Sequence, residues 1–436
     1  MIFASFAHIL LALIVAISIL LMLIRPRNIP EVYWVGGGAI LLIVLRLIPL
    51  KLAGKAAAEG SDVYLFLIGM MLLSELAREH GVFDWLSSAA LKGAHGSCAR
   101  LFTLVYGVGT LVTIFMSNDA TAVVLTPAIL AAIRKAKVPP LPYLFACAMI
   151  ANAASFVLPI SNPANLVVFH ANMPPLGRWL GSFGVPSILS IAATYVVLRF
   201  VFRSELSDGA EEGDGAKPLS PKALSPKALS MTGKIVLWGI ASMVAVLLTA
   251  SALDRDLGLP TCLAAVAITA VVCIKARSNP WNLLKEISWA TIALVAGLFI
   301  MVDAVQSIGA LKLTQAALQG VQRLAPAFAA LITGFVVGVA NNLVNNLPLG
   351  LIAGATLQAE HARGLIANAV LIGVDLGPNL SVTGSLATIL WLIALRKEKL
   401  DVSGWDFLKV GAIAMPVALA ASIGGAILMQ MLGAKF

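Results

Sequence analysis

Ser117-Asn118-Asp119-Ala120-Thr121 and the later stretch Asn345-Asn346-Leu347-Pro348 place amides, hydroxyls and a carboxylate between long apolar runs of the chain. A polar amide in hydrocarbon is costly unless it has a hydrogen-bond partner or water. Two further polar segments follow, Ser161-Asn162-Pro163-Ala164-Asn165 in the first half and residues 377–385 in the second. One such set in each half predicts two structural repeats with a polar site between them.

The composition indicates a polytopic membrane protein. Of the 436 residues, 60% are hydrophobic and 12% are charged, and the mean hydropathy is +0.95. An ordinary soluble domain is about 45–50% apolar and about 25% charged. The first 24 residues lack a basic start, and their apolar run of about 20 residues favours a membrane span over a signal peptide. The net charge of +9 is attributed to cytoplasmic loops, so no nucleic-acid partner is expected.

Apolar runs long enough to cross a bilayer predict ten spans. They cover roughly residues 2–24, 32–50, 62–80, 142–168, 184–203, 235–253, 258–275, 289–308, 366–395 and 408–432. Two further segments, 100–134 and 325–359, turn polar at their midpoints, and their arms of roughly 17 residues are short for full crossings. We predict that each is a re-entrant helical hairpin with the asparagines at its tip. The alternative is a pair of ordinary spans joined by a tight polar turn.

The two halves are related by a fixed offset. The matching residues, each 228 positions apart, are Gly69 and Gly297, Glu75 and Asp303, Gly81 and Gly309, and Asn118 and Asn346. Each half then holds five spans and one hairpin, and this odd number of spans requires an inverted repeat. The predicted fold is therefore all-α, with an N-terminal half at 1–203 and a C-terminal half at 235–436. Residues 204–234, rich in Pro and charge, are predicted to form a flexible cytoplasmic linker.

The distribution of positive charge predicts the orientation. With the N-terminus outside, the internal segments hold 21 of the 30 Lys and Arg residues, as the positive-inside rule favours. Both termini would then be external. The first hairpin would open from the cytoplasm and the second from outside.

The hairpin tips and the segments after them supply the candidate binding residues. Pro159 and Pro163 predict that helix 142–168 unwinds between them, and Pro378 predicts the same break in helix 366–395. Unwound carbonyls can bind cations, and half-helix starts suit anions or polar neutral solutes. The candidates around the tips and the first break are Asn118, Thr121, Asn345, Asn346, Ser161, Asn162 and Asn165. The alternatives are a structural proline kink and amides that only satisfy the backbone of their own hairpin.

Four carboxylates lie within apolar runs, namely Asp119, Asp375, Asp303 and Glu75. Intramembrane carboxylates are by default proton or cation sites. Asp119 and Asp375 lie beside the polar breaks, one in each half, so we predict that they carry protons. Glu75 and Asp303 are repeat mates near span ends. They are weaker candidates for coupling, because a bond to nearby backbone or to a basic residue would explain them as well.

No metal site, cofactor or ATP hydrolysis is expected from this chain. The four cysteines show no metal-ligand spacing, and the five histidines are scattered near span ends and loops. The glycines at 36–38 lie inside a span and lack the Lys-Ser/Thr of a phosphate-binding loop.

Residues 117–127, Ser-Asn-Asp-Ala-Thr-Ala-Val-Val-Leu-Thr-Pro, resemble the first-hairpin signature of the ArsB/NhaD group in the ion transporter superfamily. Residues 151–169 look most like the arsenical pump membrane proteins, ArsB, and residues 345–348 and 377–391 match the second-half pattern. The resemblance covers nearly the whole chain. It implies a scaffold domain, and a transport domain that moves as an elevator. At matching positions it implies a site formed by Asn118, Asp119, Thr121, Ser161, Asn162, Asn165, Asn346, Asn379, Ser381 and Thr383.

The resemblance also implies a function. It implies efflux of arsenite and antimonite across a bacterial inner membrane, driven by protons, with a cytoplasmic ArsA-type ATPase and a homodimer as further expectations. Arsenous acid is largely uncharged at neutral pH and needs hydrogen-bond partners, which a site rich in Asn, Ser and Thr offers. The second hairpin departs from the first, because Leu347 and Pro348 stand where Asp119 and Ala120 do. The two half-sites are therefore chemically unequal.

Other functions remain open at this point. In a Na⁺/H⁺ antiporter of the NhaD type, Asp119 and Asp375 would bind Na⁺ directly. A channel-like membrane subunit would depend on its ATPase partner for transport. A membrane-embedded enzyme is disfavoured, because no nucleophile–base pair or metal cluster appears in the sequence.

Overall fold

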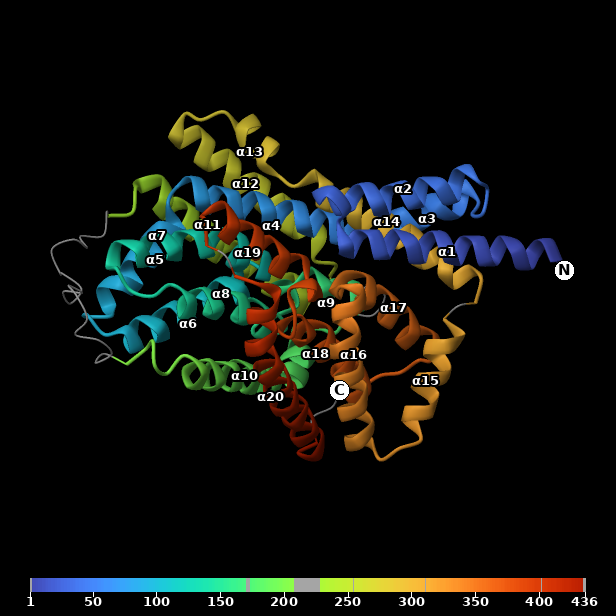
Figure 1. The fold of residues 1–436 in the computed structure, drawn as a ribbon. Coiled ribbons are helices and arrows are strands. Elements are labelled where there is room, and N and C mark those ends of the chain that lie inside the picture. The colour runs from blue at the N-terminus through green and yellow to red at the C-terminus, as the bar shows by residue number, and fades with distance from the viewer. Residues whose placement is uncertain are drawn as a thin grey trace.

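Figure 1 shows the fold as a computed structural model. It describes residues 2–169, 173–207, 228–253, 255–309, 311–400 and 402–433. These residues form helices and turns, with no strand among them. This confirms the expected all-α class. The predicted linker 204–234 lies mostly outside the described residues, because 208–227 are not among them.

The helices of the first half include long apolar ones, short amphipathic ones and one interrupted segment. They are α1 (Ile2–Ile24), α2 (Glu31–Val44), α3 (Leu50–Glu59), α4 (Ser61–Glu79), α5 (Val82–Gly93), α6 (Cys98–Phe115), the π-helical turn η2 (Ala120–Leu125), α7 (Thr126–Ala136), α8 (Leu141–Ala153), η3 (Pro159–Ser161), α9 (Pro163–Phe169) and α10 (Leu176–Val201). A short 3₁₀ turn, η1 (Pro26–Asn28), joins α1 to α2.

The second half has the same order of elements. It contains α11 (Met231–Ala252), α12 (Gly258–Ala276), α13 (Pro280–Glu286), α14 (Trp289–Ser307), α15 (Lys312–Gln322), α16 (Pro326–Val344), α17 (Asn346–Ala359), α18 (Leu365–Leu376), η5 (Gly377–Asn379), η6 (Val382–Gly384), α19 (Leu386–Lys397) and α20 (Gly404–Met431). Three pairs start 228 residues apart: α4 and α14 at Ser61 and Trp289, α6 and α16 at Cys98 and Pro326, and α10 and α20 at Leu176 and Gly404. The offset that relates the two halves of the sequence therefore also relates their helices.

Several helices are long and apolar enough to cross a membrane. Among the described residues there are seven, or eight if α3 and α4, bent by 46° at their junction, count as one span. Shorter apolar helices occupy 6–22, 31–44, 141–153 and 365–379. The predicted spans 142–168 and 366–395 are each divided into two helices by the expected breaks. The first arms of the hairpins, α6 and α16, have 18 and 19 residues, slightly more than expected.

The two halves interleave. In one group, α4 packs against α12 and α14 packs against α2, so each half supplies a partner to the other. In the second group, α10 packs against α20, α6 against α8, and α16 against α18. Figure 1 shows α1 to α4 with α11 to α14 along one side, and α6, α8, α10, α16, α18 and α20 on the other. Because elements are exchanged in this way, each half needs the other to bury its apolar faces.

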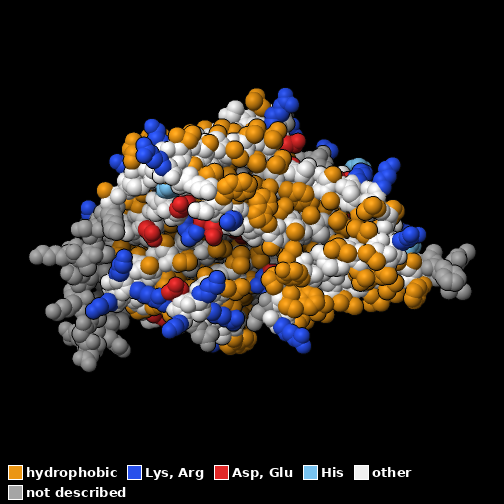
Figure 2. All heavy atoms as spheres, turned by 90° about the horizontal axis from the view of Figure 1, so that it is seen from above, with side chains coloured by type: hydrophobic (Ala, Val, Ile, Leu, Met, Phe, Trp, Pro, Cys, Tyr) orange, Lys and Arg blue, Asp and Glu red, His pale blue; other side chains and the backbone are white. Residues whose placement is uncertain are grey.

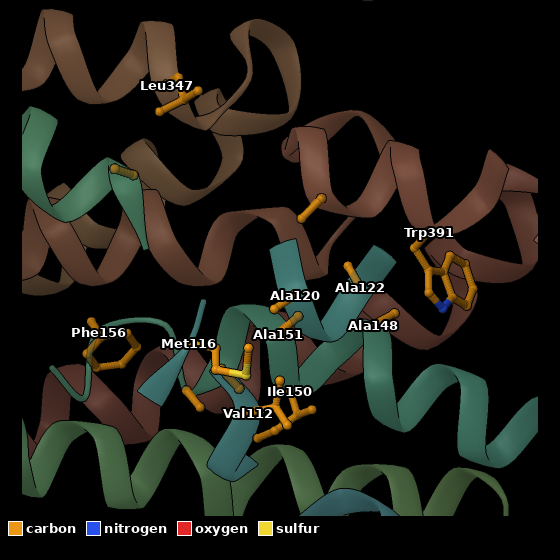
Figure 3. Close-up of a cluster of buried hydrophobic side chains, with 14 of the residues drawn as sticks. Val112, Met116, Ala120, Ala122, Ala148, Ile150, Ala151, Phe156, Leu347 and Trp391 are labelled. Carbon is orange, nitrogen blue, oxygen red and sulfur yellow. The ribbon is translucent and has the colours of Figure 1, made fainter. Parts of the chain in front are cut away.

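Each hairpin packs on the broken helix of the opposite half. In the second hairpin, α17 packs against α9 of the first half. In the first hairpin, η2 packs against α19 of the second half. Small residues allow the first tip to approach α8. Figure 3 shows Ala120 and Ala122 of η2 beside Ala151 and Ala148 of α8, with Trp391 of α19 next to them. The cross-packing brings both tips to the centre of the protein.

The outer surface fits a membrane protein. Many large hydrophobic side chains are exposed, among them Trp238, Ile274, Leu343, Phe200 and Leu313. Figure 2 shows hydrophobic side chains over the middle of one face, while most of its Lys and Arg side chains lie toward the margins. An exposed apolar surface of this extent marks a surface that contacts lipid or protein.

Candidate functional site

The first hairpin tip is held by its own polar side chains. The Asp119 N–H donates to Asn118 Oδ1 at 2.9 Å, and the Ala120 N–H donates to Ser117 Oγ at 3.1 Å. Thr121 is fully buried, and its hydroxyl lies 2.8 Å from that of Thr113 on α6. The hydroxyl of Thr121 therefore joins the two arms of the hairpin. The Asp119 carboxylate is different, because it forms no hydrogen bond or ion pair with the described residues.

The first broken helix is held open by asparagine and serine. Asn165 Nδ2 donates to the carbonyls of Ser155 at 2.8 Å and of Leu158 and Pro159 at 3.3 Å. The Ser155 and Pro159 carbonyls lose their helical partners where the chain unwinds, so Asn165 replaces the missing donors; the Leu158 carbonyl also accepts from the Ser161 N–H at 3.1 Å. Ser161 Oγ donates to the Ile114 carbonyl at 3.0 Å and ties the break to α6.

Asn162 has two roles in the structure. Its Oδ1 accepts from the Ala164 N–H at 3.0 Å, which caps the start of α9. Its Nδ2 donates to Asp375 Oδ1 at 2.8 Å, across to the second broken helix. Asp375 is fully buried, and its Oδ2 has no hydrogen-bond partner among the described residues. A carboxylate with one oxygen satisfied inside a membrane protein is a candidate proton or cation carrier.

The second hairpin tip turns at a strained residue. Asn345 has a φ of +79°, a conformation that non-glycine residues rarely adopt, and its Nδ2 donates to the Thr383 carbonyl at 3.2 Å. The next residue, Asn346, begins α17 and is 4% exposed, and its Oδ1 has no hydrogen-bond partner among the described residues. Strained residues and unsatisfied buried groups concentrate at functional sites.

The remaining predicted residues of the second half stabilise its break. Asn379 Oδ1 accepts from Asn152 Nδ2 at 2.9 Å, and its Nδ2 donates to the Met149 carbonyl at 3.1 Å. Ser381 Oγ donates to Asn342 Oδ1 at 2.7 Å, and the Thr383 hydroxyl donates to the Asn342 carbonyl at 2.9 Å. These contacts join the break to α8 and α16.

The two tips and both broken helices meet at one small cavity. It has a volume of about 20 Å³, which is room for roughly one water molecule. Its lining residues are Leu67, Asn118, Asp119, Asn162, Pro163, Thr291, Asn346, Leu347, Leu386 and Ala387. The described residues that line it include no Lys or Arg.

Four helical segments start at this cavity. Pro163, Asn346 and Leu386 are the first residues of α9, α17 and α19, and Asp119 directly precedes η2. Helix starts carry N–H donors and a partial positive charge. At α9 and η2 the first donors are already capped by Asn162, Asn118 and Ser117. Among the described residues, the free backbone donors are therefore those at the start of α17 and those that Ser385 leaves uncapped at the start of α19. The cavity therefore offers hydrogen-bond donors from backbone, amides that both donate and accept, and one free carboxylate. Such a set suits an oxygen-rich small solute.

The structure brings only some of the predicted site residues to the cavity. Asn118, Asp119, Asn162 and Asn346 line it, and Asp375 reaches it through Asn162. Asn345 borders a neighbouring small cavity together with Glu31 and Pro348. The structure places Thr121, Ser161, Asn165, Asn379, Ser381 and Thr383 within the hairpin and break scaffolding described above.

Two of the predicted coupling carboxylates lie elsewhere. Glu75 forms an ion pair with Arg78, which also lies 4.0 Å from Glu286. Asp303 lies near Lys55 and Glu59, toward the C-terminal end of α14. Neither lines the cavity.

Some residues at the site are not among the predicted site residues. Asn152 and Asn341 bond to the second break, with Asn341 Nδ2 donating to the Val374 carbonyl at 2.6 Å. The polarity of Asn152 and Asn341 within apolar runs could have indicated that they belong to the site. Leu67 and Thr291 line the cavity from α4 and α14, and their residue types are ordinary for membrane helices.

An all-helical bundle in which two hairpins and two interrupted helices enclose a polar cavity defines a multi-pass membrane transporter. The chain belongs to the citrate transporter family (CitMHS), whose sequence profile matches residues 38–373.

Similar proteins also indicate a membrane transporter. The arsenical pump membrane protein of Escherichia coli (strain K12) is 29% identical over 360 residues, covering 79% of this chain and 81% of that protein. A putative arsenical pump membrane protein of Bacillus subtilis (strain 168) is 23% identical over 414 residues, covering 91% and 93%. These matches confirm the resemblance to arsenical pump membrane proteins. The chain is a transporter of ions or arsenicals.

A solved structure shares the fold. The YdaH transporter of Alcanivorax borkumensis, described as having an unusual topology, superposes with a TM-score of 0.59 over 89% of both chains at 14% identity. At this identity the similarity concerns the fold alone.

Proposed function

We propose that this transporter exports arsenite and antimonite across the cytoplasmic membrane in exchange for protons. The observation that carries the proposal is the cavity at the hairpin tips, where Asn118, Asn162 and Asn346 meet four helix starts without a Lys or Arg among the described lining residues. Arsenous acid carries hydroxyl groups and no net charge near neutrality. Amides can donate to its oxygens and accept from its hydroxyls. The similarity to arsenical pump membrane proteins supports the same substrate.

Proton coupling would run through Asp375 and Asp119. Asp119 borders the cavity directly, and Asn162 links Asp375 to it by a 2.8 Å hydrogen bond. Protonation of Asp375 weakens the hydrogen bond from Asn162, because it removes the negative charge to which Asn162 Nδ2 donates. Because Asn162 also caps α9, this change would alter the cavity wall.

The cavity must enlarge during transport, because about 20 Å³ holds roughly one water molecule. We propose that the hairpins and broken helices move as one body against α4 and α14, which supply Leu67 and Thr291 to the cavity wall. This movement would expose the site to each side of the membrane in turn. The positive-inside rule supports external termini and a cytoplasmic mouth for the first hairpin.

The proposal is tested by uptake into everted membrane vesicles and into proteoliposomes that contain only this protein. Arsenite uptake that collapses with the proton gradient, and that disappears in Asp119→Asn, is the expected result. Uptake only after addition of a cytoplasmic ATPase would favour a membrane subunit of an ATP-driven pump. Proton-driven movement of citrate without movement of arsenite would assign the cavity to carboxylates, in line with the name of the family.

A second candidate function is Na⁺/H⁺ antiport. The free Asp119 carboxylate at the cavity favours it, because a carboxylate beside amide oxygens can bind Na⁺. Na⁺-driven proton movement that arsenite neither inhibits nor requires would support this candidate and contradict the first.

A further inference from the structure

A larger cavity lies apart from the hairpin tips. It has a volume of about 530 Å³ and is bounded by the ends of α9 and α17 and by the starts of α10 and α18. The turns at 173–175 and 361–364 form its rim. The charge distribution predicts that this face is external. It shares no lining residue with the central cavity among the described residues.

The charge of this cavity is positive. Arg178, His361 and Arg363 line it, and the described lining residues include no Asp or Glu. Arg178 and Arg363 are exposed and form no ion pair with the described residues. The neighbouring Glu360 is already bonded, because its Oε2 accepts from Gln319 Nε2 at 2.8 Å.

Two helix starts add to the positive potential. α10 begins at Leu176 and α18 at Leu365, and neither start is capped by a side chain. Uncapped starts leave free N–H donors and a partial positive charge. The C-terminus of α17 also borders the cavity, and the charge of Arg363, which follows it, offsets its partial negative charge.

A buried amide in the first turn of α18 points to a ligand. Asn368 is 5% exposed and lines the cavity, yet its Nδ2 has no hydrogen-bond partner among the described residues. Burial of an amide without a partner is costly. An acceptor atom in the cavity would satisfy this donor.

We propose that this cavity binds a small phosphate-type oxyanion, either free in solution or as the headgroup of an anionic lipid. The guanidinium groups of Arg178 and Arg363 match the geometry of such an oxyanion. Asn368 would donate a hydrogen bond from the buried side. An occupant would join α17 of the second hairpin to α10 and α18, so it should stabilise the folded protein. The proposal does not depend on which substrate the central cavity carries.

The test uses the full chain, purified in detergent. The melting temperature is measured in sodium phosphate and in sodium chloride at equal ionic strength, and the Kd for phosphate is measured by calorimetry. Asn368→Leu and Arg363→Gln remove two contacts, while Arg323→Gln removes an exposed charge directly after α15 and outside the cavity. Phosphate should stabilise the wild type and Arg323→Gln. In the other two variants the Kd should rise about tenfold or more, as expected for loss of one charge-assisted bond.

A second arm identifies the source of the oxyanion. The same proteins are placed in nanodiscs of phosphatidylglycerol or phosphatidylcholine, and their melting temperatures are compared. Stabilisation by phosphatidylglycerol that is lost in Arg363→Gln, without an effect of free phosphate, assigns the cavity to a lipid headgroup. Equal responses of all four proteins to phosphate and to phosphatidylglycerol would overturn the proposal, because they would show a general salt or lipid effect. If Asn368→Leu does not fold, the exposed Arg178→Gln takes its place.

Discussion

Asn162 connects the cavity wall to a buried carboxylate, because its side chain lines the cavity, caps α9 and donates to Asp375. The amides of the two tips approach the same space from opposite halves. Asn118 is engaged by the backbone of Asp119, whereas Asn346 Oδ1 has no partner among the described residues. At this scale the two half-sites are unequal, and the unsatisfied amide of the second tip is the one most available to a solute.

We predict that Asn346→Ala and Asn118→Ala each reduce arsenite transport by about tenfold or more, because each removes a hydrogen-bonding group from the cavity. Transport is measured in everted vesicles, and the amount of inserted protein is measured by immunoblot. Asn282→Ala, at an exposed position of α13, is the matched control and should transport normally. Full arsenite transport by both cavity variants would show that the site is assigned wrongly.

Asp375→Asn should separate proton coupling from binding. The substitution preserves the size of the side chain and an acceptor for Asn162 Nδ2, but it removes the group that can release a proton. We predict loss of uphill arsenite transport, with exchange of labelled for unlabelled arsenite retained. Both are measured in proteoliposomes with and without a proton gradient. Uphill transport at the wild-type rate would exclude Asp375 as the proton carrier.

Asn165 should matter for stability more than for binding. Its Nδ2 donates to three carbonyls of the unwound segment. Asn165→Ala leaves those of Ser155 and Pro159 without a donor, whereas the Leu158 carbonyl keeps the N–H of Ser161. We predict a loss of about 1–3 kcal/mol for each acceptor that stays unsatisfied, visible as a lower melting temperature in detergent. An unchanged melting temperature together with lost transport would instead indicate contact with the solute.

At the scale of the elements, the crossing of α16 and α18 depends on glycine. A Cβ on Gly373 would lie 2.7 Å from the Gly334 carbonyl oxygen, and a Cβ on Gly377 would lie 2.5 Å from that of Gly338. Small residues at intervals of four allow membrane helices to approach this closely. The crossing positions the second break, and therefore Asp375, against the hairpin arm.

We predict that Gly373→Ala destabilises the protein, because the new methyl group forces α16 and α18 apart. The measurement is the melting temperature of the purified protein in detergent. Gly424→Ala in α20 is the control, since a Cβ there meets no atom within 4 Å. The control should be neutral or slightly stabilising, as alanine favours a helix over glycine by about 1 kcal/mol. Equal melting temperatures of the two variants would show that the crossing tolerates a wider separation.

The sequence predicted the main elements because their signals are strong. Long apolar runs, paired prolines and the 228-residue offset led to the spans, the breaks and the repeat. The short helices α3, α5, α13 and α15 were not predicted, since one to three amphipathic turns give no run of membrane length. The polarity of Asn118 and Asn346 predicted the tips. The residue type alone does not show whether an asparagine lines the cavity or bonds to the backbone, because this depends on the direction of its side chain. Asn165 and Asn379, which bond to the scaffolding, are examples.

At the scale of the whole molecule, the cavity joins two groups of helices. Asn118, Asp119 and Asn346 belong to the hairpins, whereas Leu67 and Thr291 belong to α4 and α14. The cavity has a volume of about 20 Å³, which is room for about one water molecule. A solute larger than water needs more room, which the proposed shift of the hairpin group against the other group would provide.

A disulfide across this boundary should block transport. In a background with Cys98, Cys147, Cys262 and Cys273 replaced by Ser, we introduce Thr291→Cys and Leu347→Cys, which line the same cavity from α14 and from the second tip. Oxidation should abolish arsenite uptake in vesicles, and reduction should restore it, because the bond fixes the hairpin group to α14. Each single-cysteine variant serves as the control and should not respond to the oxidant. Full uptake by a demonstrably cross-linked protein would mean that the second tip and α14 stay together, so the proposed movement against α14 would be wrong.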